Sequence, residues 1–233
     1  MPLALASGRL TRTLTTHRST MSLWKCLTSL SLSWLLFSFQ AAYALMPPTK
    51  TTILVWGDSL SAAYGIPVEQ GWVNLLQAKL GTEFQVVNAS ISGETTSGGL
   101  ERLPAALAAI KPHYVLLELG ANDGLQGKPI TVIQDNLKQM IEKAIAAPAQ
   151  VILIGIHLPP NYGLSYTEKF DQVYKDLAEQ HQLSFIPFLL EGVATDFNLM
   201  QADGLHPTAE AQAKILEHLW PSLEYVLLKP VKP

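Results

Sequence analysis

Cysteine is almost absent from this sequence, with the single residue Cys26 among 233. Cys26 falls in an N-terminal segment that has the pattern of a cleaved signal, so the remaining chain would contain no cysteine. A disulfide scaffold, a metal site with cysteine ligands and a cysteine nucleophile are excluded together. The domain is therefore expected to be stabilised by its core.

Basic residues are scarce beyond the N-terminal segment. Residues 1–44 hold four of the 16 Lys and Arg residues and none of the 19 Asp and Glu residues, so their removal changes the formal net charge from −3 to −7. No basic run follows residue 45. Nucleic-acid binding draws its affinity from clustered Lys and Arg side chains, so nucleic acid is not expected as a partner.

Common cofactor and metal motifs are missing as well. The sequence has no Gly-x-x-x-x-Gly-Lys phosphate loop, no glycine fingerprint for dinucleotides and no His-Glu-x-x-His zinc motif. We therefore expect a chemistry that uses no cofactor and no metal ion.

The first 44 residues have the pattern of a secretory signal peptide. Basic residues without any acid precede an apolar stretch from Leu27 to Phe39, and Ala42-Tyr43-Ala44 resembles a cleavage site. We predict cleavage after Ala44 and a periplasmic or secreted location. A membrane anchor is the alternative, but the stretch contains several serines and falls short of the roughly 20 apolar residues that a spanning helix needs. The true start is Met1 or Met21.

Removal of residues 1–44 from the 233-residue chain leaves 189 residues, which suits one domain over residues 45–233. Short apolar or β-branched runs alternate with segments whose apolar residues have helical spacing. The predicted strands are residues 52–56, 84–89, 114–119, 151–156 and 184–186. Continuously apolar runs are typical of parallel strands covered on both faces. The pattern predicts an α/β fold, a three-layer α/β/α sandwich around a mostly parallel five-stranded sheet.

A serine and a histidine stand in suggestive positions. Ser59 follows the first predicted strand in Gly57-Asp58-Ser59-Leu60, and His206 lies in Asp203-Gly204-Leu205-His206-Pro207. A serine hydroxyl attacks an ester only when a base takes its proton, and His206 is the candidate base. Asp203 would orient the imidazole and stabilise its protonated form. Alone, Asp203 has a simpler interpretation as an Asx-turn residue before Gly204.

Two more segments follow predicted strands. Gly93 lies in Asn88-Ala-Ser-Ile-Ser-Gly93-Glu94-Thr95, and Asn122 lies in Gly120-Ala121-Asn122-Asp123. The carboxyl ends of parallel strands meet at one edge of the sheet, where ligands bind in such folds. Taken separately, Gly93 could be a turn glycine with positive φ and Asn122 a loop cap. Their placement together with Ser59 favours a shared site.

These four blocks resemble those of the GDSL or SGNH hydrolases, a family named after Ser, Gly, Asn and His, here Ser59, Gly93, Asn122 and His206. The likeness runs from about residue 51 to about residue 223, and is greatest to the periplasmic thioesterase I, protease I or lysophospholipase group and to bacterial arylesterases. It implies a flavodoxin-like SGNH hydrolase fold and a triad completed by Asp203. Backbone N–H groups of Ser59 and Gly93 and the Asn122 amide would form the oxyanion hole.

The resemblance implies hydrolysis of carboxylic esters and acyl thioesters through an acyl-enzyme, with small-molecule ester, thioester or lysophospholipid substrates. We expect a monomer with no stable membrane anchor. Leu125, His157 and Leu158 are predicted to contact substrate, because they lie in loops 123–130 and 157–166 beside the active edge. His157 could instead be a hydrogen-bonded residue of the rim.

Two other functions stay open. A carbohydrate O-deacetylase uses the same triad within the wider family, and a non-catalytic α/β module could bind a small anion or sugar. The apolar residues near the active edge favour acyl chains slightly. Among the remaining histidines, His218 is expected on the solvent side of the last helix, between Leu216 and Leu219.

Overall fold

The computed structural model describes residues 50–228. The predicted signal peptide, residues 1–44, lies outside the described residues. Within residues 50–228, no helix has the length and apolar character needed to cross a membrane.

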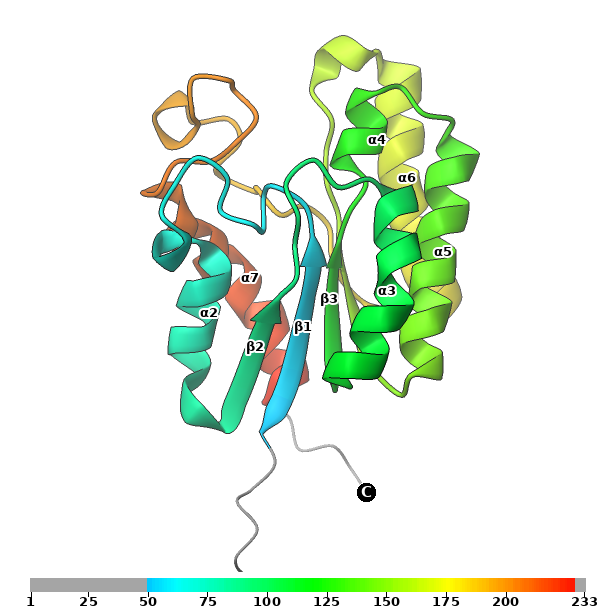
Figure 1. Cartoon of the computed structure of the whole chain (residues 1–233). Helices are drawn as coiled ribbons and strands as arrows, with labels where there is room; N and C mark the ends of the chain where they lie inside the picture. Colours follow the sequence, from blue (N-terminus) through cyan, green and yellow to red (C-terminus); the bar gives the residue numbers. More distant parts are fainter. Residues whose placement is uncertain (1–49, 229–233) are drawn as a thin grey trace, which may run out of the picture. The chain divides into compact units, whose positions relative to one another are not determined.

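A five-stranded parallel sheet forms the centre of the described domain (Figure 1). Its order is β2-β1-β3-β4-β5, and every neighbouring pair is parallel. The strands are β1 (Thr51–Gly57), β2 (Phe84–Asn88), β3 (Tyr114–Glu118), β4 (Gln150–Ile154) and β5 (Ser184–Ile186). The predicted α/β class and parallel sheet are confirmed.

Helices cover both faces of the sheet. On one side α2 (Trp72–Leu80) packs against α7 (Ala211–Leu227). On the other, α5 (Ile130–Ala146) packs between α3 (Thr96–Ile110) and α6 (Leu164–His181), as Figure 1 shows. The short elements are α4 (Ala121–Leu125) and the 3₁₀ turns η1 (Val68–Gln70), η2 (Gly81–Glu83), η3 (Pro160–Tyr162) and η4 (Phe197–Leu199).

Alternation of side chains along the strands divides the core between these two layers. In β1, Leu54 and Trp56 join the core under α3, α5 and α6, whereas Ile53 and Val55 join the core under α2 and α7. Successive strand residues point to opposite faces, so a strand buried on both sides must be apolar at every position. This requirement explains why the strands could be read as unbroken apolar runs.

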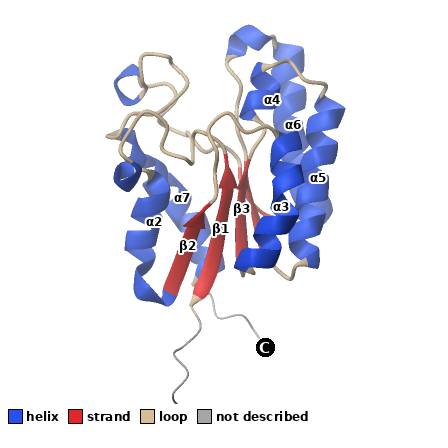
Figure 2. Cartoon of the chain, in the orientation of Figure 1, coloured by secondary structure: helices blue, strands red, loops and turns tan. Residues whose placement is uncertain are grey.

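The strand boundaries differ from the prediction chiefly at β4, which ends at Ile154 and not at residue 156. Gly155 still donates its N–H to Ile186 O at 2.8 Å, but its own carbonyl turns to accept from Leu189 N at 3.0 Å. The chain therefore leaves the sheet at Gly155, and His157 lies in the following loop. The loops after the strands gather at the carboxyl edge of the sheet, as Figure 2 shows.

Candidate active site

The turn after β1 presents Ser59 at the carboxyl edge. Asp58 is fully buried, and its Oδ1 accepts the N–H of Leu60 at 3.0 Å. The Asp58 carbonyl accepts the N–H of Ala62 at 2.9 Å. These bonds close a tight turn in which Ser59 is only half-buried, while both of its neighbours are buried.

His206 and Asp203 reach Ser59 from the loop before α7. His206 Nε2 lies 2.9 Å from Ser59 Oγ, and His206 Nδ1 lies 2.6 Å from Asp203 Oδ2. Asp203 Oδ1 also accepts the N–H groups of Leu205 at 2.9 Å and His206 at 3.0 Å. Desolvation opposes ionisation of Asp203, but the hydrogen bonds from the His206 ring and the two backbone N–H groups outweigh it and lower its pKa to about 2. The Asp203 carboxylate is thus ionised beside the ring nitrogen that it orients.

Gln201 ties the histidine loop to the serine turn. Its N–H donates to His206 O at 2.7 Å, and its Nε2 donates to Pro207 O at 2.9 Å and to Tyr64 O at 2.8 Å. The Tyr64 ring lies against the His206 imidazole, with 4.4 Å between centroids. The segment that contains Tyr64 and the segment that contains Gln201 are far apart in sequence, and these contacts hold them together beside Ser59 and His206.

Asn122 lies in the first turn of α4, and its amide faces the serine turn. Its Nδ2 donates to Glu94 O at 2.9 Å and to Asp58 Oδ2 at 3.2 Å. Gly93 adopts a φ of +80°, which L side chains rarely take, in the loop beside Glu94. The N–H of Ile91 donates to Gly57 O at 3.1 Å and holds this loop alongside the end of β1.

Arg102 on α3 fixes the Gly93 loop from behind. Its Nε lies 2.5 Å from Glu94 Oε2, and Nη1 contacts Ala89 O at 3.4 Å. Its guanidinium also lies over the Trp56 ring, 4.1 Å from the centroid. One cation thus braces both ends of the loop that carries Gly93, a contact that the sequence did not suggest.

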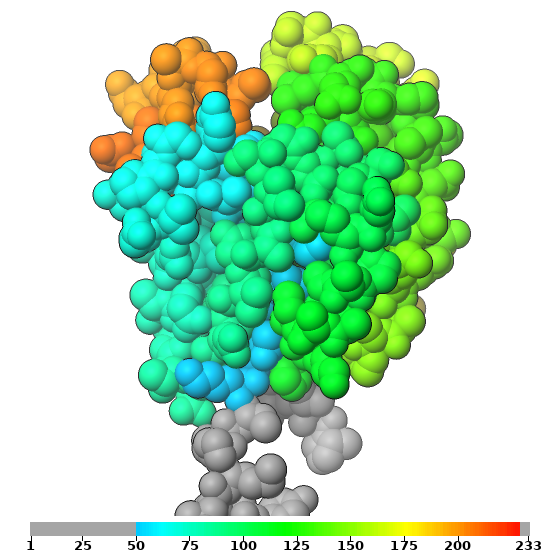
Figure 3. Space-filling model, viewed as in Figure 1, coloured from blue at the N-terminus to red at the C-terminus, as the bar shows by residue number. Residues whose placement is uncertain are grey.

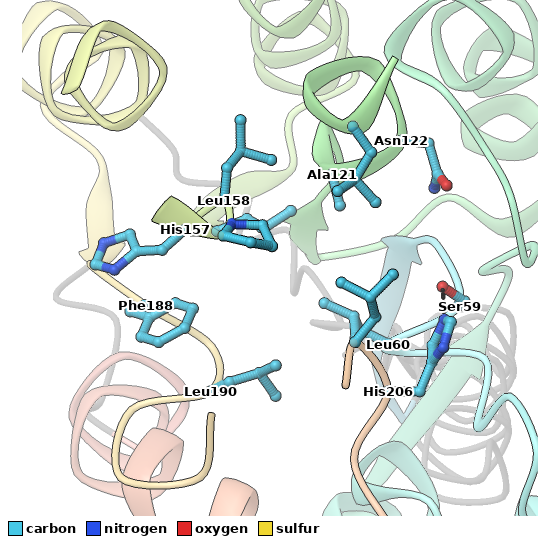
Figure 4. Close-up of a pocket in the computed structure, with 13 residues that line it drawn as sticks. Ser59, Leu60, Ala121, Asn122, His157, Leu158, Phe188, Leu190 and His206 are labelled. Atoms are coloured by element: carbon cyan, nitrogen blue, oxygen red, sulfur yellow. Dashed lines mark hydrogen bonds between the residues drawn. The ribbon is translucent and has the colours of Figure 1, made fainter. Parts of the chain in front are cut away.

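A largely apolar pocket of about 170 Å³ opens next to Ser59 (Figure 4). All three predicted substrate residues, Leu125, His157 and Leu158, line it together with Asn122. The other lining residues are Ser59, Leu60, Ala121, Ile156, Pro159, Phe188, Leu190, Leu205 and His206. Figure 4 shows His157 and Phe188 across the pocket from Ser59. Gly93 is not among the lining residues.

His157 closes the far side of this pocket. Its ring stacks on Phe188 with 4.1 Å between centroids and 8° between planes, and its Nε2 lies 3.8 Å from Asp171 Oδ2. Desolvation raises the pKa of Asp171, and the neighbouring His157 and Lys175 side chains only partly counteract this rise. His218 was expected in solvent, but it is half-buried and its Nε2 contacts Phe188 O at 2.9 Å. The α7 helix therefore helps to support the pocket wall.

The site contains one acid that sequence reasoning missed. Glu118, the last residue of β3, is fully buried beneath the serine turn, where its Oε2 lies 2.6 Å from Ser61 Oγ. The predicted strand over residues 114–119 includes it, and its acidic side chain within that apolar run was the available signal.

Asp58 is the second buried acid at this turn. Burial raises the pKa of Asp58 to about 6, and the hydrogen bond from Leu60 N and the nearby His206 partly offset this rise.

This arrangement has the parts needed for acyl transfer. A hydroxyl lies within hydrogen-bond reach of an imidazole, and the imidazole is oriented by an ionised carboxylate, as nucleophilic catalysis requires. Over residues 50–228, no group of three or more His, Cys, Asp or Glu side chains is placed to hold a metal ion. The fold and the site together indicate an ester hydrolase, with Ser59 as the candidate nucleophile.

The comparisons with known proteins identify the family. Residues 55–214 match the GDSL-like lipase/acylhydrolase family, to which the chain belongs. The chain is 52% identical over 179 residues to the esterase TesA of Pseudomonas aeruginosa, covering 76% of this chain and 89% of that protein. It is 41% identical over 189 residues to thioesterase 1/protease 1/lysophospholipase L1 of Escherichia coli K12, covering 81% and 88%.

A solved structure agrees with this assignment. It is that of the psychrotrophic esterase EstA from Pseudoalteromonas sp., inhibited by monoethylphosphonate, which is 42% identical to this chain. The two structures superpose with a TM-score of 0.74 over 77% of this chain and 100% of that chain. The expected resemblance is confirmed, and the chain is an ester hydrolase of the GDSL family.

Proposed function

We propose that Ser59, His206 and Asp203 form the catalytic triad of this esterase. His206 takes the proton of Ser59 Oγ as the hydroxyl attacks the substrate carbonyl, and Asp203 stabilises the imidazolium. His206 then protonates the leaving group, and water releases the acid from the acyl-enzyme. The observation that supports this proposal best is the continuous chain of contacts, 2.9 Å from serine to histidine and 2.6 Å from histidine to aspartate.

The oxyanion that forms during attack would be bound by the N–H groups of Ser59 and Gly93 and by the Asn122 amide. The positive φ of Gly93 and the half-buried position of Asn122 are compatible with this role. Both contacts of Asn122 Nδ2 are made within the protein, and the one to Asp58 is the longer at 3.2 Å. The oxyanion would therefore accept the same Asn122 N–H that makes this longer contact with Asp58.

Acyl chains are the substrate class that the pocket supports. Leu125 ends α4 and Leu158 lies in the loop after β4; both line the pocket, and an acyl group attached to Ser59 would pass between them. A sugar would leave such a wall poorly matched, since its hydroxyls would lose water without gaining hydrogen bonds. Carboxylic esters, acyl thioesters and lysophospholipids are thus favoured over acetylated carbohydrates.

We also propose that residues 1–44 are a signal peptide cut after Ala44, and that the mature monomer acts in the periplasm or outside the cell without nucleic-acid partners. The charge pattern and small residues of the N-terminal segment support export. Intact mass of the protein recovered from the periplasmic fraction tests it. A mass that retains residues 1–44 would contradict cleavage.

A substrate panel tests the proposed activity. Purified residues 45–233 would be assayed with p-nitrophenyl esters from acetate to long chains, an acyl thioester, a lysophospholipid and an acetylated sugar. We expect turnover of the acyl substrates and little of the sugar. The Ser59→Ala variant should lose the activity, whereas Ser97→Ala, an exposed control on α3, should keep it. Preference for the acetylated sugar would favour the deacetylase instead.

A further inference from the structure

The carboxyl group of Glu118 lies directly beneath the turn that carries Ser59. Its side chain is fully buried, and Oε2 accepts the Ser61 hydroxyl at 2.6 Å. The same oxygen accepts the N–H of Asp58 at 3.4 Å, whereas Oε1 is buried with no hydrogen-bond partner. A buried carboxyl is costly unless its contacts compensate for lost water. The position therefore calls for an explanation beyond packing.

The end of β1 leaves space for this carboxyl. Gly57 pairs with Glu118 across the sheet, and a Cβ added at Gly57 would lie 2.5 Å from Glu118 Oε2 and 2.9 Å from Ser61 Oγ. Since real Cβ atoms essentially never approach so closely, a side chain at Gly57 would displace the carboxyl. Gly57 and Glu118 thus form one fitted pair under the serine turn.

We propose that Glu118 is a positioning residue that fixes the nucleophile. Its carboxyl joins the two sides of the turn, because Asp58 N–H precedes Ser59 and the Ser61 hydroxyl follows it. Holding both sides sets the direction of the Ser59 hydroxyl toward His206 and of the Ser59 N–H toward the oxyanion. This inference rests on the proposed role of Ser59 as nucleophile.

The role does not require a negative charge. Burial, with a smaller contribution from the Asp58 carboxylate, raises the pKa of Glu118 well above its ordinary value, despite the bonds from Ser61 and Asp58 N. A neutral side chain of the same shape with an acceptor oxygen should therefore do the same work. Glutamine meets both conditions, whereas leucine fills the space and leaves two buried donors unpaired.

Kinetics of Glu118→Gln and Glu118→Leu test the proposal. We expect Glu118→Gln to keep at least a third of the wild-type kcat, and Glu118→Leu to lose about 10- to 100-fold in kcat, because small misplacements of reacting groups are costly. KM should stay within about twofold in both, since neither variant alters the acyl pocket. The rate of fluorophosphonate labelling should fall in parallel with kcat. Leu117→Val, in the same strand but facing the opposite core, is the control for lost stability alone.

Ser61→Ala removes one of the two contacts and gives a second readout if Glu118→Leu does not fold. It should lower kcat less than Glu118→Leu does, and in a Glu118→Leu background it should cost nothing further. The proposal is overturned if Glu118→Leu keeps the wild-type kcat, if Gln and Leu lose equally, or if Ser61→Ala leaves kcat unchanged. Activity that survives Ser59→Ala would instead refute the triad itself, and this outcome is distinguishable from the others.

Discussion

Replacement of Leu125 by alanine should separate acyl-chain recognition from catalysis. Leu125 ends α4, is half-buried and lines the pocket beside Ser59. The change deletes three carbons, and at about 0.8 kcal/mol for each buried CH₂ the upper limit is about 2.4 kcal/mol. Only part of the side chain faces the pocket, so we expect a loss of about 1 to 2 kcal/mol, or roughly 5- to 30-fold in kcat/KM, for long-chain esters.

The assay measures kcat/KM for p-nitrophenyl acetate and for a long-chain ester. It is carried out with the wild type, with Leu125→Ala and with a control variant, Leu164→Ala. If Leu125 contacts only the distal part of an acyl chain, the kcat/KM for acetate should stay within about twofold. Leu164→Ala is the control, because Leu164 is 71% exposed and is not among the residues that line this pocket. Equal losses for acetate and the long-chain ester would refute the acyl path. Leu158 is less suitable, since it is only 8% exposed and its truncation should also cost about 2–5 kcal/mol of unfolding free energy.

Three further predictions concern the charged and polar groups of the site. Asn122→Ala should lower kcat by roughly a hundredfold with little change in KM, as for loss of one oxyanion donor; a rise in KM alone would assign it to ground-state binding. The Asp203 carboxylate, with its pKa lowered to about 2, should stay ionised at every pH above about 4, so Asp203→Asn should have a much lower kcat/KM than the wild type throughout that range; equal kcat/KM in the two proteins would contradict the orienting role of Asp203. For Asp58, burial raises the pKa from 3.8 to about 6, so the folded state binds the proton more tightly and the wild type should lose up to about 3 kcal/mol of unfolding free energy as pH rises through that window. Denaturant unfolding of Asp58→Asn should show a smaller slope, with a remainder from Glu118, whose pKa burial also raises. An equal slope in both proteins would show that Asp58 does not contribute to it.

The fold was predictable because its strands are apolar at consecutive positions. Ile53 to Trp56 and the core of β3 must fill two separate hydrophobic cores, and that requirement is visible in the sequence. The motif residues were predictable for a related reason, since each follows a strand and parallel strands end at one edge. The sequence therefore predicted the layers of the fold and the meeting of Ser59 with His206.

Features that depend on side-chain contacts across the fold were not predictable. Glu118 interrupts an apolar strand without any local sign that a glycine opposite would make room for it. The contact from His218 to Phe188 O joins α7 to the pocket wall, and helical spacing alone placed that histidine in solvent. Arg102 supports the Gly93 loop through Glu94, a contact that depends on how α3 packs on β1.

Covalent labelling of the wild-type protein with a fluorophosphonate, followed by peptide mass mapping, tests the central claim most directly. The account predicts one adduct per chain on Ser59, with loss of esterase activity in proportion to labelling. Ser59→Ala should take up no label and should retain far less than a tenth of the wild-type kcat while remaining folded. A different labelled residue, or a Ser59→Ala variant that keeps more than about a tenth of kcat, a barrier change of only about 1.4 kcal/mol, would contradict the assignment of Ser59 as the nucleophile.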